Sequence, residues 1–148
     1  MSKTGKKRLC VGSIRNPIYR KLKLSNGSKL SHLESTQIDI PLSSQRVGYL
    51  HINSKQSGMF EKYQDHIDEI INHPDYIFED KFREDTILVA KQIIANHVML
   101  VIALNFAKPR HTNTLVTLWE VAIGDFERER KRFEKFGKVL YIKGKVSV

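Results

Sequence analysis

Cysteine is almost absent from this chain, and the long apolar runs that span membranes are absent too. The 148 residues include one cysteine, Cys10, which cannot form an internal disulfide and is typical of a reducing cytoplasm. No apolar run approaches the roughly 20 residues that cross a bilayer, and no apolar segment of a secretory signal follows the basic start of the chain. We therefore expect a cytoplasmic protein with no membrane partner.

Several motifs of catalytic chemistry are also missing. The sequence contains no glycine-rich loop that would cradle a phosphate and no serine nucleophile elbow. The histidines have no cysteine or acidic partner at zinc spacing, so we expect neither a metal nor another cofactor. Any catalysis then has to come from ordinary side chains.

Acidic residues are missing from the first 30 residues, which contain nine Lys or Arg. Of the 25 basic residues in the chain this leaves 16 for the remainder, where 16 acidic residues balance them and the net charge of the whole chain is +9. A second basic cluster occupies residues 125–145. Such clusters favour contact with phosphate backbones, and the alternative is a solvated arm that keeps the protein soluble. We divide the chain into a basic N-terminal arm or small lobe, 1–46, and a main domain, 47–148.

Four apolar runs of strand length dominate the middle of the chain. They cover 74–78, 86–94, 98–104 and 113–121 and are rich in Val, Ile, Leu, Thr and aromatic residues. The polar breaks between them are short enough for hairpins, so the pattern predicts an antiparallel meander. The second and third runs are apolar on both alternating sets of positions and are predicted as central strands.

Two amphipathic segments flank these strands. Residues 59–72 carry an apolar stripe at helical spacing and end before Pro74. Residues 125–136 form a second such segment, with Gly137 placed to stop it in a left-handed cap, and 139–142 follow as a closing strand. The fold class is therefore α+β: a compact single domain with an antiparallel sheet of four to five strands, a preceding amphipathic helix and a C-terminal helix.

The first 46 residues carry weaker signals. Residues 8–14 are predicted as a short strand, and Pro17 suits the first turn of a helix through Leu24. Asn26-Gly27 is a strong turn signal. Residues 38–42 alternate in hydropathy, but Pro41 restricts them to an edge strand or an extended arm.

Short motifs in a fixed order carry a resemblance to a known family. They are His51-Ile52, Tyr63, Asn72-His73-Pro74-Asp75-Tyr76-Ile77, Thr86 with Val89 and Lys91, Val101-Ile102-Ala103-Leu104, Asn113 to Thr117, and Lys138 to Lys143. With this order and spacing, residues 47–143 resemble the phage-type Barnase–EndoU–Colicin–RelE-like (BECR) nucleases of prophages and related mobile elements. The resemblance implies a RelE- or barnase-like α+β fold and metal-independent RNA cleavage, possible toxin-like action in the host cytoplasm, RNA as substrate, and an antidote or immunity protein as a further partner.

One position departs from the family pattern. The family typically shows a second histidine four residues after the His-Ile pair, and Gln56 stands there in this chain. A glutamine can hold a phosphate or a 2′-hydroxyl but cannot shuttle protons at neutral pH. The alternative to a ribonuclease is therefore a catalytically weak or inactive nucleic-acid-binding phage accessory protein on the same fold. A structural interaction protein with charged docking arms is a third hypothesis.

Metal-free RNA cleavage needs a base for the 2′-hydroxyl proton, an acid for the leaving 5′ oxygen, and cations or hydroxyls around the phosphorane. The candidate catalytic residues are His51, Lys91, Thr117 and His66. The candidate nucleic-acid-binding residues are Gln56, Arg110, Trp119, Lys138 and Lys143.

Each candidate also has a structural alternative. His51 could be a surface or capping residue, and His66 a partly buried structural one. Lys91 could extend its ammonium group to solvent at the sheet edge. The Thr117 hydroxyl could bond to the backbone and Trp119 could belong to the core. If the catalytic hypothesis holds, we expect His51, Lys91 and Thr117 to line one concave face of the sheet.

Overall fold

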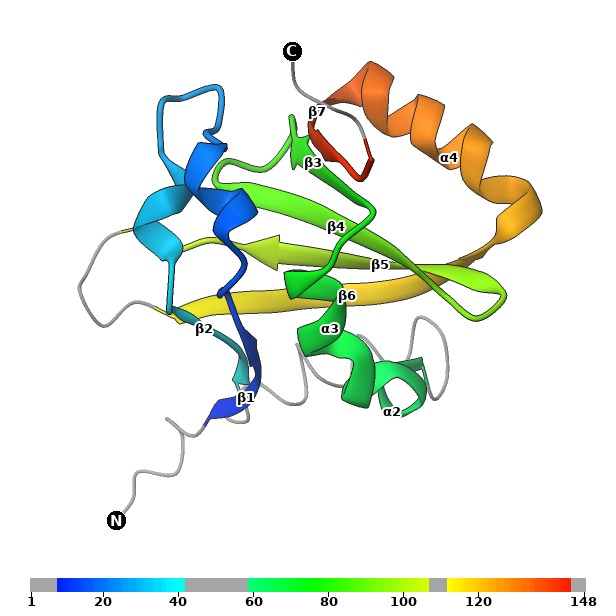
Figure 1. The fold of residues 1–148 in the computed structure, drawn as a ribbon, viewed down its shortest axis with the longest axis horizontal. Coiled ribbons are helices and arrows are strands. Elements are labelled where there is room, and N and C mark those ends of the chain that lie inside the picture. The colour runs from blue at the N-terminus through cyan, green and yellow to red at the C-terminus, as the bar shows by residue number, and fades with distance from the viewer. Residues whose placement is uncertain (1–7, 42–58, 107–111, 145–148) are drawn as a thin grey trace.

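The structure is a computed structural model that describes residues 8–41, 59–106 and 112–144. Within these residues seven strands form one mixed sheet, in the order β1-β2-β6-β5-β4-β3-β7 (Figure 1). The strands are β1 Arg8–Ser13, β2 Gln37–Pro41, β3 Tyr76–Asp80, β4 Thr86–Ile93, β5 Asn96–Ala103, β6 Thr112–Ala122 and β7 Gly137–Ile142. Neighbouring strands are antiparallel except β2 and β6, which run parallel.

The predicted antiparallel meander is confirmed as β3-β4-β5-β6. Strands β4 and β5 pair along their whole length, from Thr86 opposite Ala103 to Ile93 opposite Asn96. Most residues of both strands are buried on both alternating sets of positions, because side chains of a central strand meet a packed layer on each face. The continuous apolar runs in the sequence therefore reported these strands correctly.

The α+β class is confirmed. The predicted sheet of four to five antiparallel strands is wrong, because the sheet has seven strands and one neighbouring pair, β2 and β6, is parallel. The predicted first strand, β1, pairs with β2, and β2 in turn pairs with the start of β6. Strand β2 thus lies inside the sheet and is not the edge strand that Pro41 suggested. The strand tolerates Pro41 because it is the last residue of β2, where it stands opposite Arg8.

The helical elements before the central strands are shorter and more interrupted than the sequence predicts, whereas the C-terminal helix is continuous and begins two residues earlier than predicted. The helical elements are η2 Pro17–Lys21, η3 Leu30–Leu33, α2 Met59–Tyr63, η5 Gln64–His66, α3 Ile67–Asn72 and α4 Ile123–Phe136. The predicted helix over 59–72 is therefore two α-helices with a 3₁₀ turn between them. The tighter turn changes the phase of the helix so that Phe60, Tyr63, Ile67 and Ile70 are all buried.

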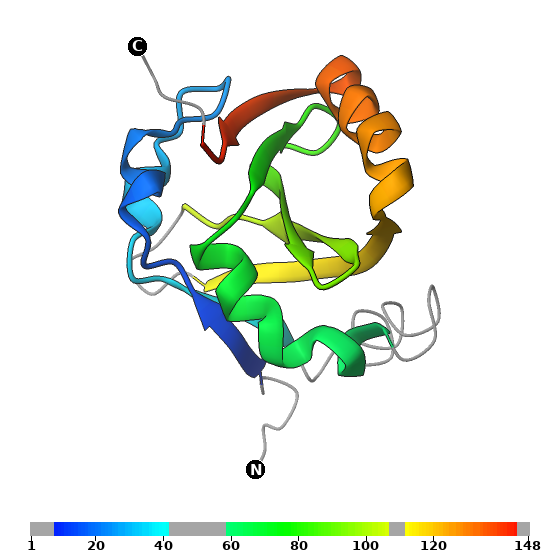
Figure 2. The ribbon, with the colours of Figure 1, turned by 45° about the vertical axis from the view of Figure 1, so that its right-hand side comes forward.

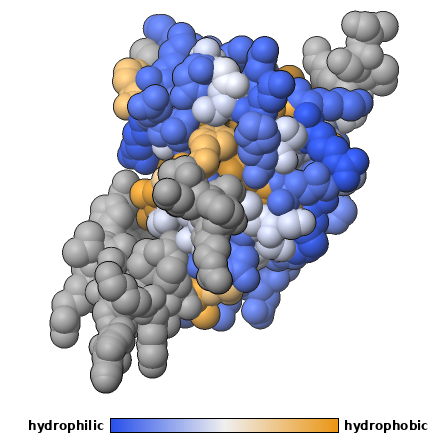
Figure 3. Space-filling view, turned by 90° about the vertical axis from the view of Figure 1, so that its left-hand side faces the viewer, coloured by the Kyte–Doolittle hydropathy of each residue, from blue (hydrophilic) through white to orange (hydrophobic). Residues whose placement is uncertain are grey.

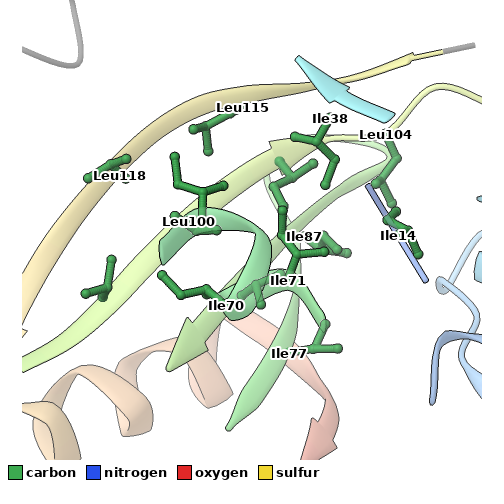
Figure 4. Close-up of a cluster of buried hydrophobic side chains, with 14 of the residues drawn as sticks. Ile14, Ile38, Ile70, Ile71, Ile77, Ile87, Leu100, Leu104, Leu115 and Leu118 are labelled. Atoms are coloured by element: carbon green, nitrogen blue, oxygen red, sulfur yellow. The ribbon is translucent and has the colours of Figure 1, made fainter. Parts of the chain in front are cut away.

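The two faces of the central sheet are covered by different helices (Figures 1 and 2). On one face, here called the α3 face, Ile70 and Ile71 pack against Ile77, Ile87 and Leu100 (Figure 4). This cluster also contains Ile14, Leu30, Leu33, Ile38 and Ile40, which come from the N-terminal segment. Residues 8–41 thus share the sheet and the main core with the rest of the chain. A boundary at residue 46 falls outside the described residues and stays a prediction.

The other face, here called the α4 face, packs against α4. Phe126 lies among Ala90, Met99 and Val121, and its ring stacks on the ring of His97 with the centroids 3.7 Å apart. Burial lowers the pKa of His97, because the charged imidazolium loses its hydration there. The C-terminal helix is therefore joined to the sheet by an aromatic contact that includes a titratable ring.

The junction after α4 corrects another expectation. Gly137 does not cap the helix in a left-handed conformation but is the first residue of β7, where it pairs with Asp80 of β3. The chain passes directly from the helix into the closing strand, so pairing with β3 satisfies the backbone that a cap would otherwise serve.

The segment after β1 is attached to α3 by one buried side chain. Asn72 Nδ2 donates to the carbonyl oxygens of Ser13 (2.8 Å) and Asp68 (3.0 Å), and its Oδ1 accepts from the N–H groups of Arg15 (2.7 Å) and Asn16 (3.0 Å). Asp68 adds an ion pair with Arg15, which lowers the pKa of that carboxyl group. In the part of the chain that the structure describes, no helix has both the length and the apolar character needed to cross a bilayer.

Candidate functional site

Two of the predicted catalytic residues lie on opposite faces of the sheet. Lys91 stands opposite Val98, which belongs to the main core on the α3 face. Thr117 stands opposite Val101, which packs with Phe78 on the α4 face. Directly opposed residues of antiparallel strands point to the same side of the sheet. The expectation that Lys91 and Thr117 share one concave face is therefore wrong.

A β-bulge in β6 explains the error. The partner of Val101 is Thr117, but the partner of the next residue, Ile102, is Leu115, so Val116 is an additional residue in β6. The bulge reverses the alternation of side chains and places Leu115 and Thr117 on different faces. Thr117 is 6% exposed, and its hydroxyl has no hydrogen-bond partner among the described residues. The structural alternative, a hydrogen bond from the Thr117 hydroxyl to the backbone, is therefore not found among the described residues either.

A polar cluster on the α3 face surrounds Glu120, a residue that the sequence did not single out. Glu120 Oε1 accepts hydrogen bonds from the Tyr63 hydroxyl, from Lys62 Nζ at 3.0 Å and from Asn96 Nδ2 at 3.2 Å. Helix α2 supplies Lys62 and Tyr63, β5 supplies Asn96 and β6 supplies Glu120. Helix α2 therefore packs against the open end of the β5–β6 hairpin, where β5 begins and β6 ends, and the cluster is assembled from three separate elements.

Hydrogen bonding determines the charge state of this cluster. The Tyr63 hydroxyl, followed by Lys62, lowers the pKa of the Glu120 carboxyl group, which stays charged at neutral pH. Burial raises the pKa of Tyr63, so its hydroxyl keeps its proton and remains a donor. The hydrogen bond to Glu120 raises the pKa of Lys62, which stays a cation. The side chain of Glu120 is 28% exposed, and all three bonds fall on Oε1, so Oε2 has no hydrogen bond from the described residues.

His66 lies beside this cluster. Its ring meets the ring of Tyr63 edge to face with the centroids 6.4 Å apart. Its Nδ1 lies 3.2 Å from Glu69 Oε1, and 40% of the side chain is exposed. The contact with Glu69 orients the imidazole and leaves Nε2 without a partner among the described residues. His66 thus combines a structural contact with a free ring nitrogen.

Lys91 belongs to the same face and the same row of side chains. It stands opposite Val98, and Val98 stands opposite Glu120, so the three residues form one cross-strand row. Two strand spacings of about 4.8 Å place the Lys91 and Glu120 backbones roughly 10 Å apart. A lysine side chain can cover much of this span. The α3 face therefore presents a carboxylate, two lysines, a tyrosine hydroxyl and an imidazole around one end of the sheet.

The other predicted residues are dispersed. Trp119 is half-buried on the α4 face, opposite Met99, so it packs against both apolar clusters of that face. Lys138 is exposed on β7 opposite Glu79. Lys143 is exposed, with Nζ 3.7 Å from Asp75 Oδ1. His51, Gln56 and Arg110 lie outside the described residues, so their placement and roles stay predictions.

Sequence reasoning missed Glu120, Lys62, Tyr63 and Asn96 as a group. One signal was available, since Glu120 interrupts an apolar strand in the same way as Lys91 does. The contacts of Glu120 with Tyr63 and Lys62 could not be read from the sequence, because the partners are 57 and 58 positions apart in the chain.

Residues 8–41, 59–106 and 112–144 contain no group of three or more His, Cys, Asp or Glu side chains able to hold a metal ion. Comparison of the chain with models of protein families, with curated proteins and with solved structures found no match.

Proposed function

We propose that this chain is a metal-independent RNA endonuclease of phage or prophage origin that cleaves RNA by attack of a 2′-hydroxyl on the adjacent phosphate. The observation that carries the proposal is Glu120: a charged carboxylate, half-buried, anchored through Oε1, with no hydrogen bond to Oε2 from the described residues. Two lysines and an imidazole lie around the same end of the sheet. These are the types of group that metal-free cleavage needs.

The proposed reaction uses only side chains of the α3 face. Glu120 Oε2 accepts the proton of the 2′-hydroxyl, and the 2′ oxygen bonds to phosphorus. The bond from phosphorus to the 5′ oxygen breaks, and His66 Nε2 gives that oxygen a proton. The products are a 2′,3′-cyclic phosphate and a free 5′-hydroxyl. Lys62 and Lys91 stabilise the charge that develops on the phosphorane oxygens.

The resemblance to BECR nucleases supports the same reaction class and adds residues to it. His51 remains the predicted alternative to Glu120 as base or to His66 as acid, and Gln56 and Arg110 remain predicted contacts to RNA. Thr117 is not part of the proposed site, because it is buried on the α4 face. We propose the cytoplasm of a host cell as the place of action, with an antidote or immunity protein as a further partner.

Gel-resolved cleavage of a generic RNA in the presence of EDTA tests the proposal. Glu120→Gln keeps the size of the side chain and an oxygen for Tyr63, but it removes the proton acceptor. We expect it to lower the cleavage rate by roughly 10²- to 10⁴-fold, the usual contribution of general acid–base catalysis, with RNA affinity nearly unchanged.

The matched control for this substitution is Glu127→Gln. Glu127 is likewise ion-paired, with its pKa lowered by a hydrogen bond from Arg130, but it lies on α4. This variant should cleave at the wild-type rate. Equal rates for Glu120→Gln and Glu127→Gln would remove Glu120 from the chemistry.

A nucleic-acid-binding protein without catalysis is the second candidate function. Two observations favour it: Lys91 and Thr117 lie on different faces, and Gln56 replaces a histidine of the family pattern. Gln56→His should raise activity if the replacement removed a catalytic group. If wild type and Gln56→His both bind RNA and neither cleaves it, the binding protein is the correct description.

A further inference from the structure

A pocket of about 390 Å³ lies in the N-terminal part of the molecule, far from Glu120. It is lined by Asn26, Gly27, Ser28, Lys29, His32 and Phe106. Its volume falls in the range of small-molecule sites. Phe106 lies three residues after Ala103, the last residue of β5, whereas Asn96, the first residue of β5, contacts Glu120. The eight residues of β5 separate the two places by about 24 Å.

Lys29, which lines the pocket, stands directly opposite a second lysine, Lys23. Lys23 and Lys29 form an antiparallel bridge on either side of the turn at Asn26-Gly27. The turn is closed by hydrogen bonds from the Leu24 N–H to the Ser28 carbonyl and from the Gly27 N–H to the Leu24 carbonyl, and Gly27 takes a φ of 95° that few other residues adopt. The backbone therefore holds the two lysines in a fixed juxtaposition.

This juxtaposition is electrostatically unfavourable without an anion. Opposed residues of a bridge have their Cβ atoms about 5 Å apart, and like charges at that position destabilise the pair. Neither Lys23 nor Lys29 forms an ion pair with any described carboxylate, unlike Arg20 of the same segment, which pairs with Glu34. The acidic groups that the turn contacts are all bound by other donors: Ser25 donates to Glu79, and the Asn26 amide donates to Glu84 and Asp85.

We infer that this pocket is an RNA subsite that holds one nucleotide of a single strand, with its phosphate on Lys23 and Lys29 and its base stacked on Phe106. The inference deepens the proposed function and rests on RNA being the ligand of this chain. A phosphate between the two ammonium groups relieves their repulsion, and the His32 side chain at the pocket wall supplies a further hydrogen-bonding group. An aromatic ring beside a basic groove is the usual arrangement for an unpaired base.

The surroundings of the pocket suit this ligand. The turn that carries the pocket is the blue loop at the upper left of Figure 1, and Figure 3 shows that hydrophilic residues cover most of this side of the molecule around a smaller hydrophobic area. A single strand in the pocket would leave its remaining nucleotides free to follow the molecule toward Glu120. At about 3.4 Å per nucleotide even a stacked strand of twelve nucleotides covers roughly 40 Å, more than the length of β5.

Binding of a twelve-nucleotide single-stranded RNA with 2′-O-methyl groups tests the inference, because this probe cannot be cleaved by 2′-hydroxyl attack. Fluorescence anisotropy of the full chain is measured between 50 and 200 mM salt. The double variant Lys23→Gln/Lys29→Gln should reduce the slope of log affinity against log salt by about 0.7, since the two lysines hold one phosphate and each phosphate contact of a single strand contributes about 0.7. The control Lys131→Gln/Lys135→Gln removes two exposed lysines of α4, away from the pocket, and should keep the wild-type slope.

Phe106→Leu tests the base contact. Phe106 packs partly against the main core, and leucine preserves an apolar side chain there. We expect it to weaken binding of the probe by about 5-fold or more, the lower end of the effect of losing one stacked base, and to leave binding of an abasic strand unchanged. An intact unfolding transition of the variant shows that the fold is preserved.

The subsite is wrong if the Lys23→Gln/Lys29→Gln slope equals that of the control, or if wild type does not bind the probe. These outcomes are distinct from failure of the proposed function. A wild-type protein that binds the probe through the two lysines but cleaves no unmodified RNA would retain the subsite and lose the endonuclease.

Discussion

Replacement of Asn72 by alanine should remove a large part of the stability of the fold. The Asn72 side chain makes four hydrogen bonds of 2.7 to 3.0 Å to backbone groups, and the side chain is 4% exposed. Three of its partners are Ser13, the last residue of β1, and Arg15 and Asn16 of the segment that follows it. Alanine would leave these groups without partners at the contact between that segment and α3.

The expected magnitude follows from the number of bonds. Each intramolecular hydrogen bond contributes about 1 kcal/mol net, and a buried group left unpaired costs more. We therefore expect Asn72→Ala to lower the free energy of unfolding by about 3 to 5 kcal/mol. Because single domains have only about 5 to 15 kcal/mol in total, the variant should unfold at a much lower urea concentration.

Urea unfolding followed by the fluorescence of Trp119, the one tryptophan of the chain, provides the assay. Gln64→Ala is the control, because Gln64 is an exposed amide in the same helical region, and its replacement should change the unfolding free energy by no more than about 0.5 kcal/mol. A loss below about 1 kcal/mol for Asn72→Ala would refute the reasoning, since it would mean that the attachment to α3 does not depend on these bonds.

Three further predictions follow from packing, burial and pKa. Gly12→Ala should destabilise the protein by about 1 to 3 kcal/mol, because an added Cβ would lie 2.9 Å from Asp68 Oδ1; Gly124→Ala, whose Cβ meets nothing within 4 Å, should not, and equal unfolding free energies of the two would contradict the close approach. Burial lowers the pKa of His97, so below about pH 6.5 the unfolded chain binds the proton first and the free energy of unfolding falls as the pH drops. In urea unfolding from pH 7.5 to 5.5, His97→Phe should lose less stability than wild type, and parallel pH profiles of the two proteins would argue against this linkage. Thr117→Val removes a buried hydroxyl that has no partner among the described residues, so it should leave the free energy of unfolding equal or raise it by about 1 kcal/mol. RNA cleavage should be unchanged, and abolished cleavage would return Thr117 to the site.

The sequence predicted the elements that local pattern determines. The four apolar runs gave β3 to β6, and the amphipathic segment 125–136 gave most of α4, because burial on one or both faces sets the spacing of apolar residues. The position of β2 could not be predicted in this way. Its parallel pairing with β6 joins residues 75 positions apart, such as Ile38 and Asn113, and no local signal reports that contact.

The candidate site was predicted only in part for two physical reasons. The bulge at Val116 inverts the face of Thr117, and a single additional residue leaves no mark in hydropathy alternation. Glu120 gains its partners only when α2 packs on the β5–β6 hairpin, so its charge state depends on tertiary contacts. Lys91 was found because a lysine in an apolar strand is conspicuous, and the same argument applied to Glu120 would have identified it.

The chemical nature of the cleavage products tests the proposed function most directly. Wild-type protein is incubated with a 5′-labelled RNA in EDTA, and the new 3′ ends are examined for a 2′,3′-cyclic phosphate, with the same RNA carrying 2′-deoxy substitutions as the control. We predict cleavage that yields cyclic phosphate ends and that stops at deoxy positions. Cleavage of the deoxy control, products with free 3′-hydroxyl ends, or the absence of any cleavage while RNA is bound would each contradict 2′-hydroxyl attack on the α3 face.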